Sequence, residues 1–74
     1  MYLIDLKKGQ KAIIKKINAN SALKQRLFSL GLVNGATIEI IDCSIGKSTI
    51  EVKVGSTLVA LRDSEAKQIE VEAI

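Results

Sequence analysis

The spacing of apolar and polar residues first predicts a short strand. In the run KAIIKKI at residues 11–17, Ala12 and Ile14 share one face, whereas Ile17 falls out of phase with them. Apolar residues two positions apart are typical of a half-buried strand, and a one-residue slip in that spacing is typical of a bulge. We therefore predict a strand over residues 11–17, with a bulge or an end near Lys15-Lys16.

The spacing then changes to that of a helix. Leu23, Leu27 and Leu30 recur at intervals of four and three, so that a helix would place them in one apolar stripe. The preceding segment, Asn18-Ala19-Asn20-Ser21, offers side-chain oxygens that can cap free backbone N–H groups. Gly31 stands at the position of a left-handed C-terminal cap, which glycine adopts without a steric penalty. One short helix is predicted to end just before Gly31.

After Asn34-Gly35 the apolar spacing returns to two. Further strands are predicted over residues 37–41, 49–54, 57–61 and about 68–72. Ser44–Ser48 is predicted as a hairpin loop, and a short polar turn capped by Asp63 or Ser64 precedes the last strand. The whole pattern predicts a mainly β fold: a small five-stranded antiparallel barrel with one short α-helix inserted after the first strand.

Length and composition limit the size and setting of this fold. The 74 residues suit a single domain, residues 1–74, and a chain of this size buries only roughly 60% of its unfolded surface. Aromatic residues make up 3% of the chain, so the core is expected to be aliphatic. With Cys43 as the only cysteine, no internal disulfide can form, which suits a reducing compartment. No signal peptide or membrane span is recognisable, and we expect a cytoplasmic protein.

Charge is distributed unevenly along the chain. Residues 1–37 carry seven Lys or Arg against one Asp, a net charge of +6, whereas residues 38–74 carry four bases and seven acids, a net charge of −3. If the two halves separate in space, a positive face would suit an acidic protein, a phosphate backbone or anionic lipid headgroups. An ordinary solvated surface is the alternative.

Two sequence stretches identify a family. Leu-Phe-Ser-Leu-Gly-Leu at residues 27–32, followed by Gly35, is coupled to Ala-Leu-Arg-Asp-Ser-Glu-Ala at residues 60–66. With the apolar positions of the strands, these stretches resemble the FeoA family of small cytosolic SH3-like barrels, which accompany the bacterial ferrous iron transporter FeoB. The chain departs from the family in having Asn34-Gly35 where Pro-Gly is common and in having no proline in the Ser44–Ser48 loop; Asn-Gly can form a comparable turn.

The resemblance implies a small accessory or regulatory protein of ferrous iron uptake. It would act by contact with the cytosolic domain of a FeoB-like membrane GTPase. Transition metal ion binding is also associated with the family. A similar barrel ends metal-dependent repressors of the diphtheria toxin repressor type, so a stand-alone relative of that domain is an alternative. No helix-turn-helix precedes the barrel here, which favours the free-standing accessory protein.

The residues argue against nucleotide binding. Gly46-Lys47-Ser48 looks like the end of a phosphate-binding P-loop, but Ile41 stands where that motif needs its first glycine. The segment is also predicted to join two strands, so no helix N-terminus would be available for the phosphate. We predict no bound cofactor.

Metal binding and catalysis are not predicted either. The chain has no histidine, and Cys43 has no second soft ligand for a closed metal site, so its simplest interpretation is a small packing residue near a strand end. Without histidine, neither Cys43 nor any serine has the usual general base. We predict that the protein is not an enzyme.

Nucleic-acid binding is the main alternative to protein recognition. Small barrels often bind RNA, and the first half of the chain is rich in lysine. However, stacking on bases needs aromatic side chains, and Tyr2 and Phe28 are the only ones. We therefore consider an RNA- or DNA-binding module less well supported.

Protein contact remains as the predicted activity. Phe28 directly follows Leu27 and cannot share the full leucine stripe, so it is expected at the rim of the helix near two basic residues. Its alternative role is to complete the core under the barrel mouth, and the two apolar residues after Gly31 have the same two interpretations. Self-association is left open. The predicted partner-binding residues are Lys24, Arg26, Phe28, Leu32 and Val33.

Overall fold

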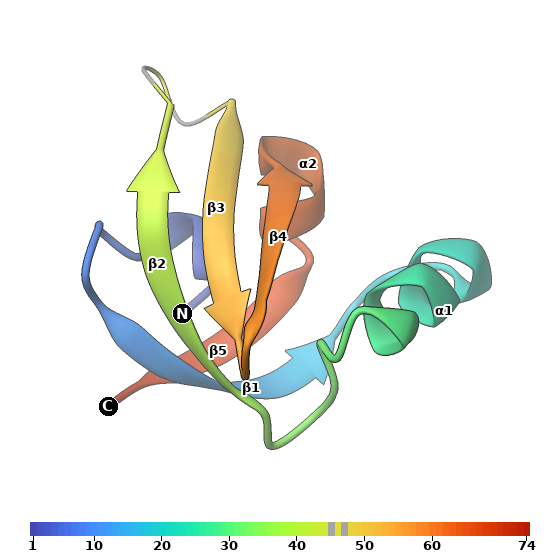
Figure 1. The fold of residues 1–74 in the computed structure, drawn as a ribbon. Helices are drawn as coiled ribbons and strands as arrows, with labels where there is room; N and C mark the ends of the chain where they lie inside the picture. Colours follow the sequence, from blue (N-terminus) through green and yellow to red (C-terminus); the bar gives the residue numbers. More distant parts are fainter. Residues whose placement is uncertain (45, 47) are drawn as a thin grey trace.

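The chain forms one antiparallel sheet with a helix beside it (Figure 1). The computed structural model describes residues 1–44, 46 and 48–74. Within the predicted hairpin loop and its Gly46-Lys47-Ser48 motif, Ile45 and Lys47 lie outside the described residues. The elements, in chain order, are η1 (Leu3–Asp5), β1 (Lys11–Ile17), α1 (Ser21–Ser29), β2 (Thr37–Cys43), β3 (Thr49–Val54), β4 (Thr57–Arg62), α2 (Asp63–Ala66) and β5 (Ile69–Ala73).

The strands follow the order β4-β3-β2-β1-β5, and every neighbouring pair is antiparallel. The predicted five-stranded arrangement, with a helix after the first strand, is therefore confirmed. The predicted bulge is also confirmed, because the pairing of β1 with β5 shifts register between Ile14 and Lys16. This shift turns Ile17 back to the interior, where it is 3% exposed. A second shift interrupts the pairing of β2 with β3 between Ile40 and Asp42.

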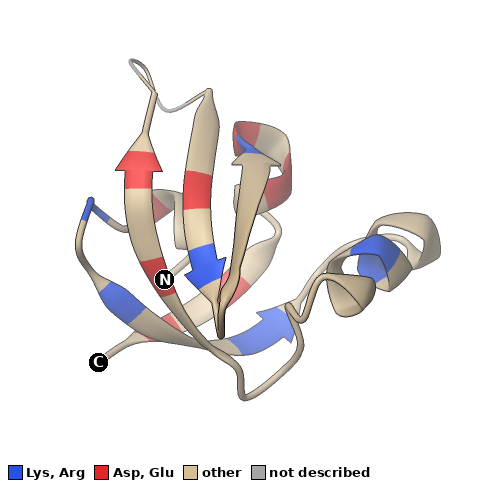
Figure 2. Cartoon of the chain, in the orientation of Figure 1, with Lys and Arg blue, Asp and Glu red and all other residues tan. Residues whose placement is uncertain are grey.

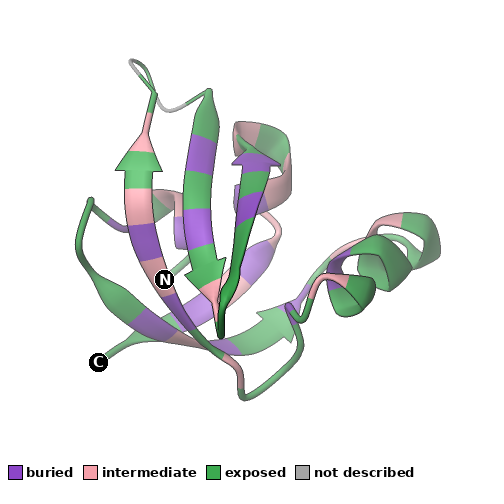
Figure 3. Ribbon diagram, viewed as in Figure 1, coloured by how far each residue is buried: buried purple, intermediate pink, exposed green. Residues whose placement is uncertain are grey.

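The core is aliphatic, as the composition predicts. Figure 3 shows buried positions alternating with exposed ones along the strands, whereas most of α1 is exposed. Leu27 is the one fully buried residue of α1, and Leu23 and Leu30 pack against the core from partly buried positions. The buried residues are Leu3, Leu6, Ala12, Ile14, Ile17, Leu27, Leu32, Ile38, Ile40, Ile50, Val52, Val59, Leu61, Ala66, Ile69 and Val71.

Two short helical turns were not predicted. Residues 63–66, predicted as a polar turn, form α2, and η1 precedes the first strand. In both, an acidic side chain three residues after the capping position accepts a backbone N–H: Asp5 from Tyr2 at 2.9 Å, and Glu65 from Arg62 at 2.9 Å. These bonds satisfy donors that a helix start leaves free, which stabilises turns too short to show a period.

The N-terminal residues cover the outer edge of β5. The backbone N–H of Val71 donates to the carbonyl of Met1 at 2.8 Å, and Tyr2 forms an isolated antiparallel bridge with Glu70. The N-terminal segment thus takes hydrogen-bonding positions that a sixth strand would use. Leu3 and Leu6, just beyond it, fill the barrel interior.

The two oppositely charged halves of the chain do not separate in space. Lys15 lies 3.2 Å from the carboxylate of Glu72, and Lys8 lies 4.0 Å from that of Asp42. Figure 2 shows basic and acidic positions on neighbouring strands of the sheet. The uneven charge of the sequence therefore gives a mixed surface around the barrel. Among the helices of the described chain, none has the length and apolar character needed to cross a bilayer.

Candidate protein-contact surface

The start of α1 is fixed by a side-chain cap. The Oδ1 atom of Asn20 accepts the backbone N–H of Leu23 at 2.9 Å, and its backbone carbonyl accepts that of Lys24 at 2.9 Å. Asn20 itself has extended backbone angles, with φ −68° and ψ 170°, as expected of an N-cap residue. One of the predicted capping residues therefore sets the first turn of the helix.

The end of α1 is a left-handed cap centred on Gly31. The N–H of Gly31 donates to the carbonyl of Phe28 at 3.0 Å, and the N–H of Leu32 donates to that of Leu27 at 2.9 Å. This pair of bonds is the Schellman motif, and Gly31 has the positive φ of 91° that the motif needs. The motif brings the residue after Gly31 back toward the last turn of the helix.

The geometry of the cap determines which of the two residues after Gly31 is buried and which is exposed. Leu32 is fully buried, so its side chain belongs to the core and cannot contact a partner in the folded chain. This corrects its prediction as a partner-binding residue: the hydrophobic contact of a Schellman motif turns that position toward the helix. Val33, the next residue, is 39% exposed and begins a turn closed by the Ala36 N–H and the Val33 carbonyl at 3.0 Å.

The other predicted contact residues are exposed, but they do not share one face of α1. Phe28 is 47% exposed, and Lys24 and Arg26 are also exposed. Lys24 and Phe28 are four residues apart and therefore lie on one flank. Arg26 lies about 200° from Phe28 around the helix axis, at about 100° per residue. The contact residues thus divide between two flanks of the helix.

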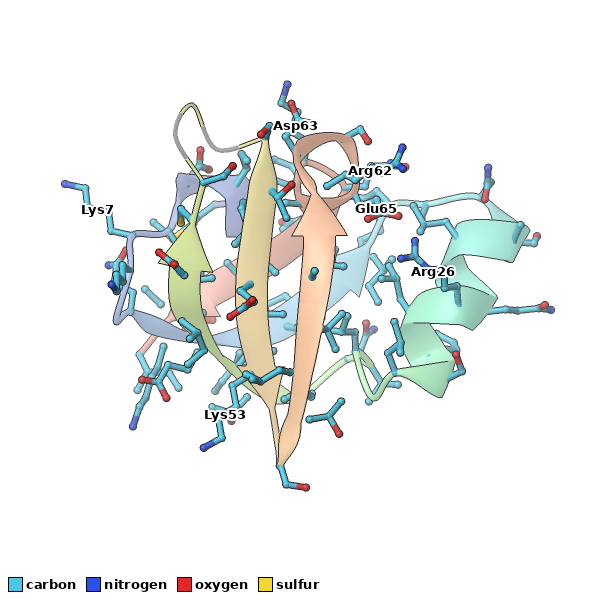
Figure 4. The ribbon with its side chains drawn as sticks, turned by 45° about the horizontal axis from the view of Figure 1, so that its top comes forward. Lys7, Arg26, Lys53, Arg62, Asp63 and Glu65 are labelled. Carbon is cyan, nitrogen blue, oxygen red and sulfur yellow. The ribbon has the colours of Figure 1, made fainter. Side chains whose placement is uncertain are left out.

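The Arg26 flank faces α2. The Nη1 atom of Arg26 donates to Oε2 of Glu65, while Oε1 of Glu65 accepts the backbone N–H of Arg62 at 2.9 Å. Figure 4 shows the labelled side chains of Arg26 and Glu65 directed toward one another. The side chain of Glu65 is 12% exposed and that of Arg26 is 53% exposed. About half of the Arg26 side chain therefore stays exposed to solvent.

A groove of about 620 Å³ lies on this flank. It is bounded by α1 on one side and by the end of β4 with α2 on the other. Two of the three charged side chains that line it are arginines, and the third is Glu65. Its main lining residues are Ala22, Leu23, Arg26, Arg62, Ser64 and Glu65.

Sequence reasoning did not predict that Leu58 is exposed. Leu58 on β4 is 60% exposed, more than Phe28 or Val33. The signal was present in the alternation, because Val59 and Leu61 point into the core and Leu58 must then point outward. Because all four residues of Leu58–Leu61 are apolar, composition alone does not show which face of this strand is exposed.

The structure places Cys43 where a packing residue was predicted. It is the last residue of β2, is half-buried and packs against the core. Within residues 1–44, 46 and 48–74, no three Cys, Asp or Glu side chains gather in a way that would hold a metal ion.

The relatives of this chain are iron transport proteins. A putative Fe(2+) transport protein A from Campylobacter jejuni is 45% identical over 74 residues, which cover the whole of both chains. In Porphyromonas gingivalis, a fusion of Fe(2+) transport protein A with the Fe(2+) transporter FeoB is 30% identical over 74 residues. That match covers all of this chain and 9% of the fusion protein.

Solved structures share the fold. FeoA from Chlorobium tepidum superimposes with a TM-score of 0.94 at 34% identity, over 100% of this chain and 70% of that one. Stenotrophomonas maltophilia FeoA, solved with zinc and described as an SH3 domain protein, gives 0.85 at 34% identity, over 97% and 89% of the two chains. A manganese-dependent transcriptional repressor, 19% identical, gives 0.90 over 100% of this chain and 41% of the repressor, which shows a shared fold alone.

The family model of the FeoA domain matches residues 1–73, nearly the whole chain. The match includes α1 with its Gly31 cap and the segment from β4 through α2, the two stretches on which the resemblance was based. The chain belongs to the FeoA family.

Proposed function

We propose that this protein is an accessory protein of ferrous iron uptake that docks on the cytosolic domain of a FeoB-type transporter. Membership of the FeoA family supports the role in ferrous iron transport. The contact would be made by the exposed flank of α1 and the turn that follows it. Its residues are Lys24, Phe28 and Val33, with Arg26 on the opposite flank of the helix.

The observation that carries the proposed partner is the fusion protein. In it, a segment similar to the whole of this chain is joined to the Fe(2+) transporter FeoB. Joining two proteins in one polypeptide raises the effective concentration of each near the other, which favours pairs that work in contact. A separate chain of the same family would need a surface that reaches the transporter without such a tether.

The exposed side chains support α1 as that surface. Phe28 and Val33 are 47% and 39% exposed, while the aliphatic core is complete without them. Aromatic side chains beside cationic ones are frequent energetic centres of protein interfaces. Lys24 lies one helical turn before Phe28, so a partner with an apolar pocket next to a carboxylate would fit this flank.

A calorimetric titration tests the proposal. The purified chain is titrated with the cytosolic domain of the transporter from the same cell, both with and without guanine nucleotide. We expect saturable binding that weakens at least about fivefold in Phe28→Ala, because truncating an interface anchor typically costs more than about 1 kcal/mol. Absence of binding at high micromolar concentration in both nucleotide states would contradict the proposal.

A matched variant checks that any loss comes from the contact surface. Ile74→Ala removes a side chain that is 73% exposed, but after β5 instead of on α1. If the α1 flank makes the contact, this variant binds like the unchanged chain. Equal losses in the two variants would show that the loss does not come from the α1 flank.

A further inference from the structure

The two edges of the sheet differ in how they are covered. β5 forms one edge, and Met1 and Tyr2 bond to its outer side. β4 forms the other edge, and among the described residues it pairs only with β3. Figure 1 shows the free side of β4 turned toward the helix side of the molecule. The sheet therefore accepts an added segment at one edge and leaves the other edge open.

The unpaired backbone groups on β4 are those of Leu58 and Ala60. Val54 and Thr57 pair across a two-residue turn, and the N–H of Asp63 donates back to the carbonyl of Ser48 at 3.1 Å. Because hydrogen bonding alternates along an antiparallel strand, every second residue between these points faces away from β3. Leu58 and Ala60 thus direct an N–H and a C=O each outward, with no partner among the described residues.

The usual protection of an exposed edge is missing from β4. The segment Thr57–Leu61 contains no charge and no proline, and its pairing with β3 continues without a bulge. Ala60 is exposed, and Leu58 is 60% exposed. Such an edge is suited to pairing with another extended chain.

The groove between α1 and α2 adds a preference for charge at one end of this edge. Arg62, the last residue of β4, lines it together with Arg26. Both oxygens of Glu65, the carboxylate in the lining, are already hydrogen-bonded. Glu51 and Lys53 flank Ala60 and Leu58 from β3, one strand further away, and their charges are opposite. An added segment would meet apolar surface at Leu58 and positive charge at Arg62.

We propose that the open edge of β4 takes up an extended segment of the transporter's cytosolic portion as an additional strand. The segment would place an apolar side chain beside Leu58 and a carboxylate about four residues away beside Arg62, since both belong to one face of β4. This inference rests on the proposed function, because the transporter supplies the segment. It adds the kind of segment bound and the backbone groups that hold it.

Amide hydrogen exchange of the isotopically labelled chain tests the proposal. The chain is compared alone and with a saturating amount of the unlabelled cytosolic domain of the transporter. We expect exchange at the Leu58 and Ala60 amides to slow at least about tenfold on binding, because each gains a hydrogen bond. The amide of Ala73, which faces outward on β5, keeps its rate.

A pair of proline variants measures the contribution of one outward N–H. Ala60→Pro removes a donor on the open edge without removing a bond to β3, and Ala73→Pro makes the same change on the opposite edge. We expect Ala60→Pro to weaken binding about tenfold and Ala73→Pro to change it less than about twofold. If thermal melting shows that Ala60→Pro does not fold, the amide protection of the unchanged chain is the test of the added strand.

The outcomes separate this inference from the proposed function. Binding of the domain without protection at Leu58 and Ala60 overturns the added strand and leaves docking intact. Protection that grows with the chain's own concentration, in the absence of the domain, assigns the edge to a second copy and also overturns it. If the unchanged chain does not bind the domain at all, docking fails, and the added strand fails with it.

Discussion

The guanidinium group of Arg26 on α1 donates a hydrogen bond to the carboxylate of Glu65 on α2, 39 residues later in the chain. The other oxygen of Glu65 accepts the N–H of Arg62, which is the first bond of α2. One side chain therefore caps a short helix and also holds α1 against the barrel. This matters because α1 buries only Leu27 completely.

Removing Glu65 is expected to destabilise the fold more than removing Arg26. Glu65→Ala leaves the N–H of Arg62 and the guanidinium of Arg26 without their partner, at a cost of about 1–3 kcal/mol in unfolding free energy. Arg26→Ala removes an arginine that is half exposed, at a cost below about 1 kcal/mol. Urea denaturation of both variants and the double variant measures the coupling. If the losses in unfolding free energy of the two single variants simply add in the double variant, Arg26 and Glu65 do not couple α1 to α2.

Gly31 is predicted to be required for its backbone angle and not for lack of space. A Cβ built at this position would lie 3.5 Å from Cγ1 of Val54, which is ordinary contact. The positive φ nevertheless disfavours any L side chain, so Gly31→Ala and Gly31→Val are expected to destabilise by at least about 1 kcal/mol. Gly31→Asn should recover part of the loss, because asparagine tolerates left-handed angles better. An unchanged melting temperature in Gly31→Ala would contradict the requirement for glycine at this backbone angle.

The neighbours Leu32 and Val33 should respond very differently to truncation. Leu32→Ala opens a cavity in the core and is expected to cost about 2–5 kcal/mol. Val33→Ala changes an exposed side chain, and we expect a change in stability within about 0.5 kcal/mol. Thermal unfolding of the two variants makes the comparison. Similar losses would mean that both residues serve the core.

Charge at the start of α1 is expected to affect binding and not stability. Lys24→Glu should weaken binding to the transporter domain and make it less sensitive to salt, because a rim charge acts mainly on association. The added acid lies near a helix N-terminus, which favours the fold. The control is Lys7→Glu, a reversal of the same sign on the side of the barrel away from α1 (Figure 4). If both reversals weaken binding equally, the effect follows net charge and not this flank.

The strands were predictable because their signal is local and repeated. Ile17 shows why even the bulge could be found: only an inserted residue brings an out-of-phase isoleucine back to the core. The turn at Asn34-Gly35 was also predictable, and Gly35 has the positive φ of 89° that it needs. Turns such as η1 and α2 contain too few residues to show a period. Their only signals are the acidic side chains three residues after each cap.

The contact surface was less predictable because adjacent apolar residues look alike in a sequence. The Schellman bonds decide that Leu32 is buried and Val33 exposed, and those bonds depend on the whole turn. The position of Arg26 on a separate flank follows from helical geometry, but its partner Glu65 comes from a distant segment. The open edge of β4 depends on which strand ends the sheet, and a single strand does not carry that information.

The paired charges around the barrel also bear on how the chain folds. Before the strands meet, the chain consists of two blocks, residues 1–37 with net charge +6 and residues 38–74 with net charge −3. Their attraction favours early encounters between β1 and the distant β5, the two strands that Lys15 and Glu72 later join. Salt at 0.1 M screens this attraction beyond about 10 Å. Refolding of this protein should therefore slow as ionic strength rises, although basic and acidic side chains are intermixed on the surface of the folded barrel.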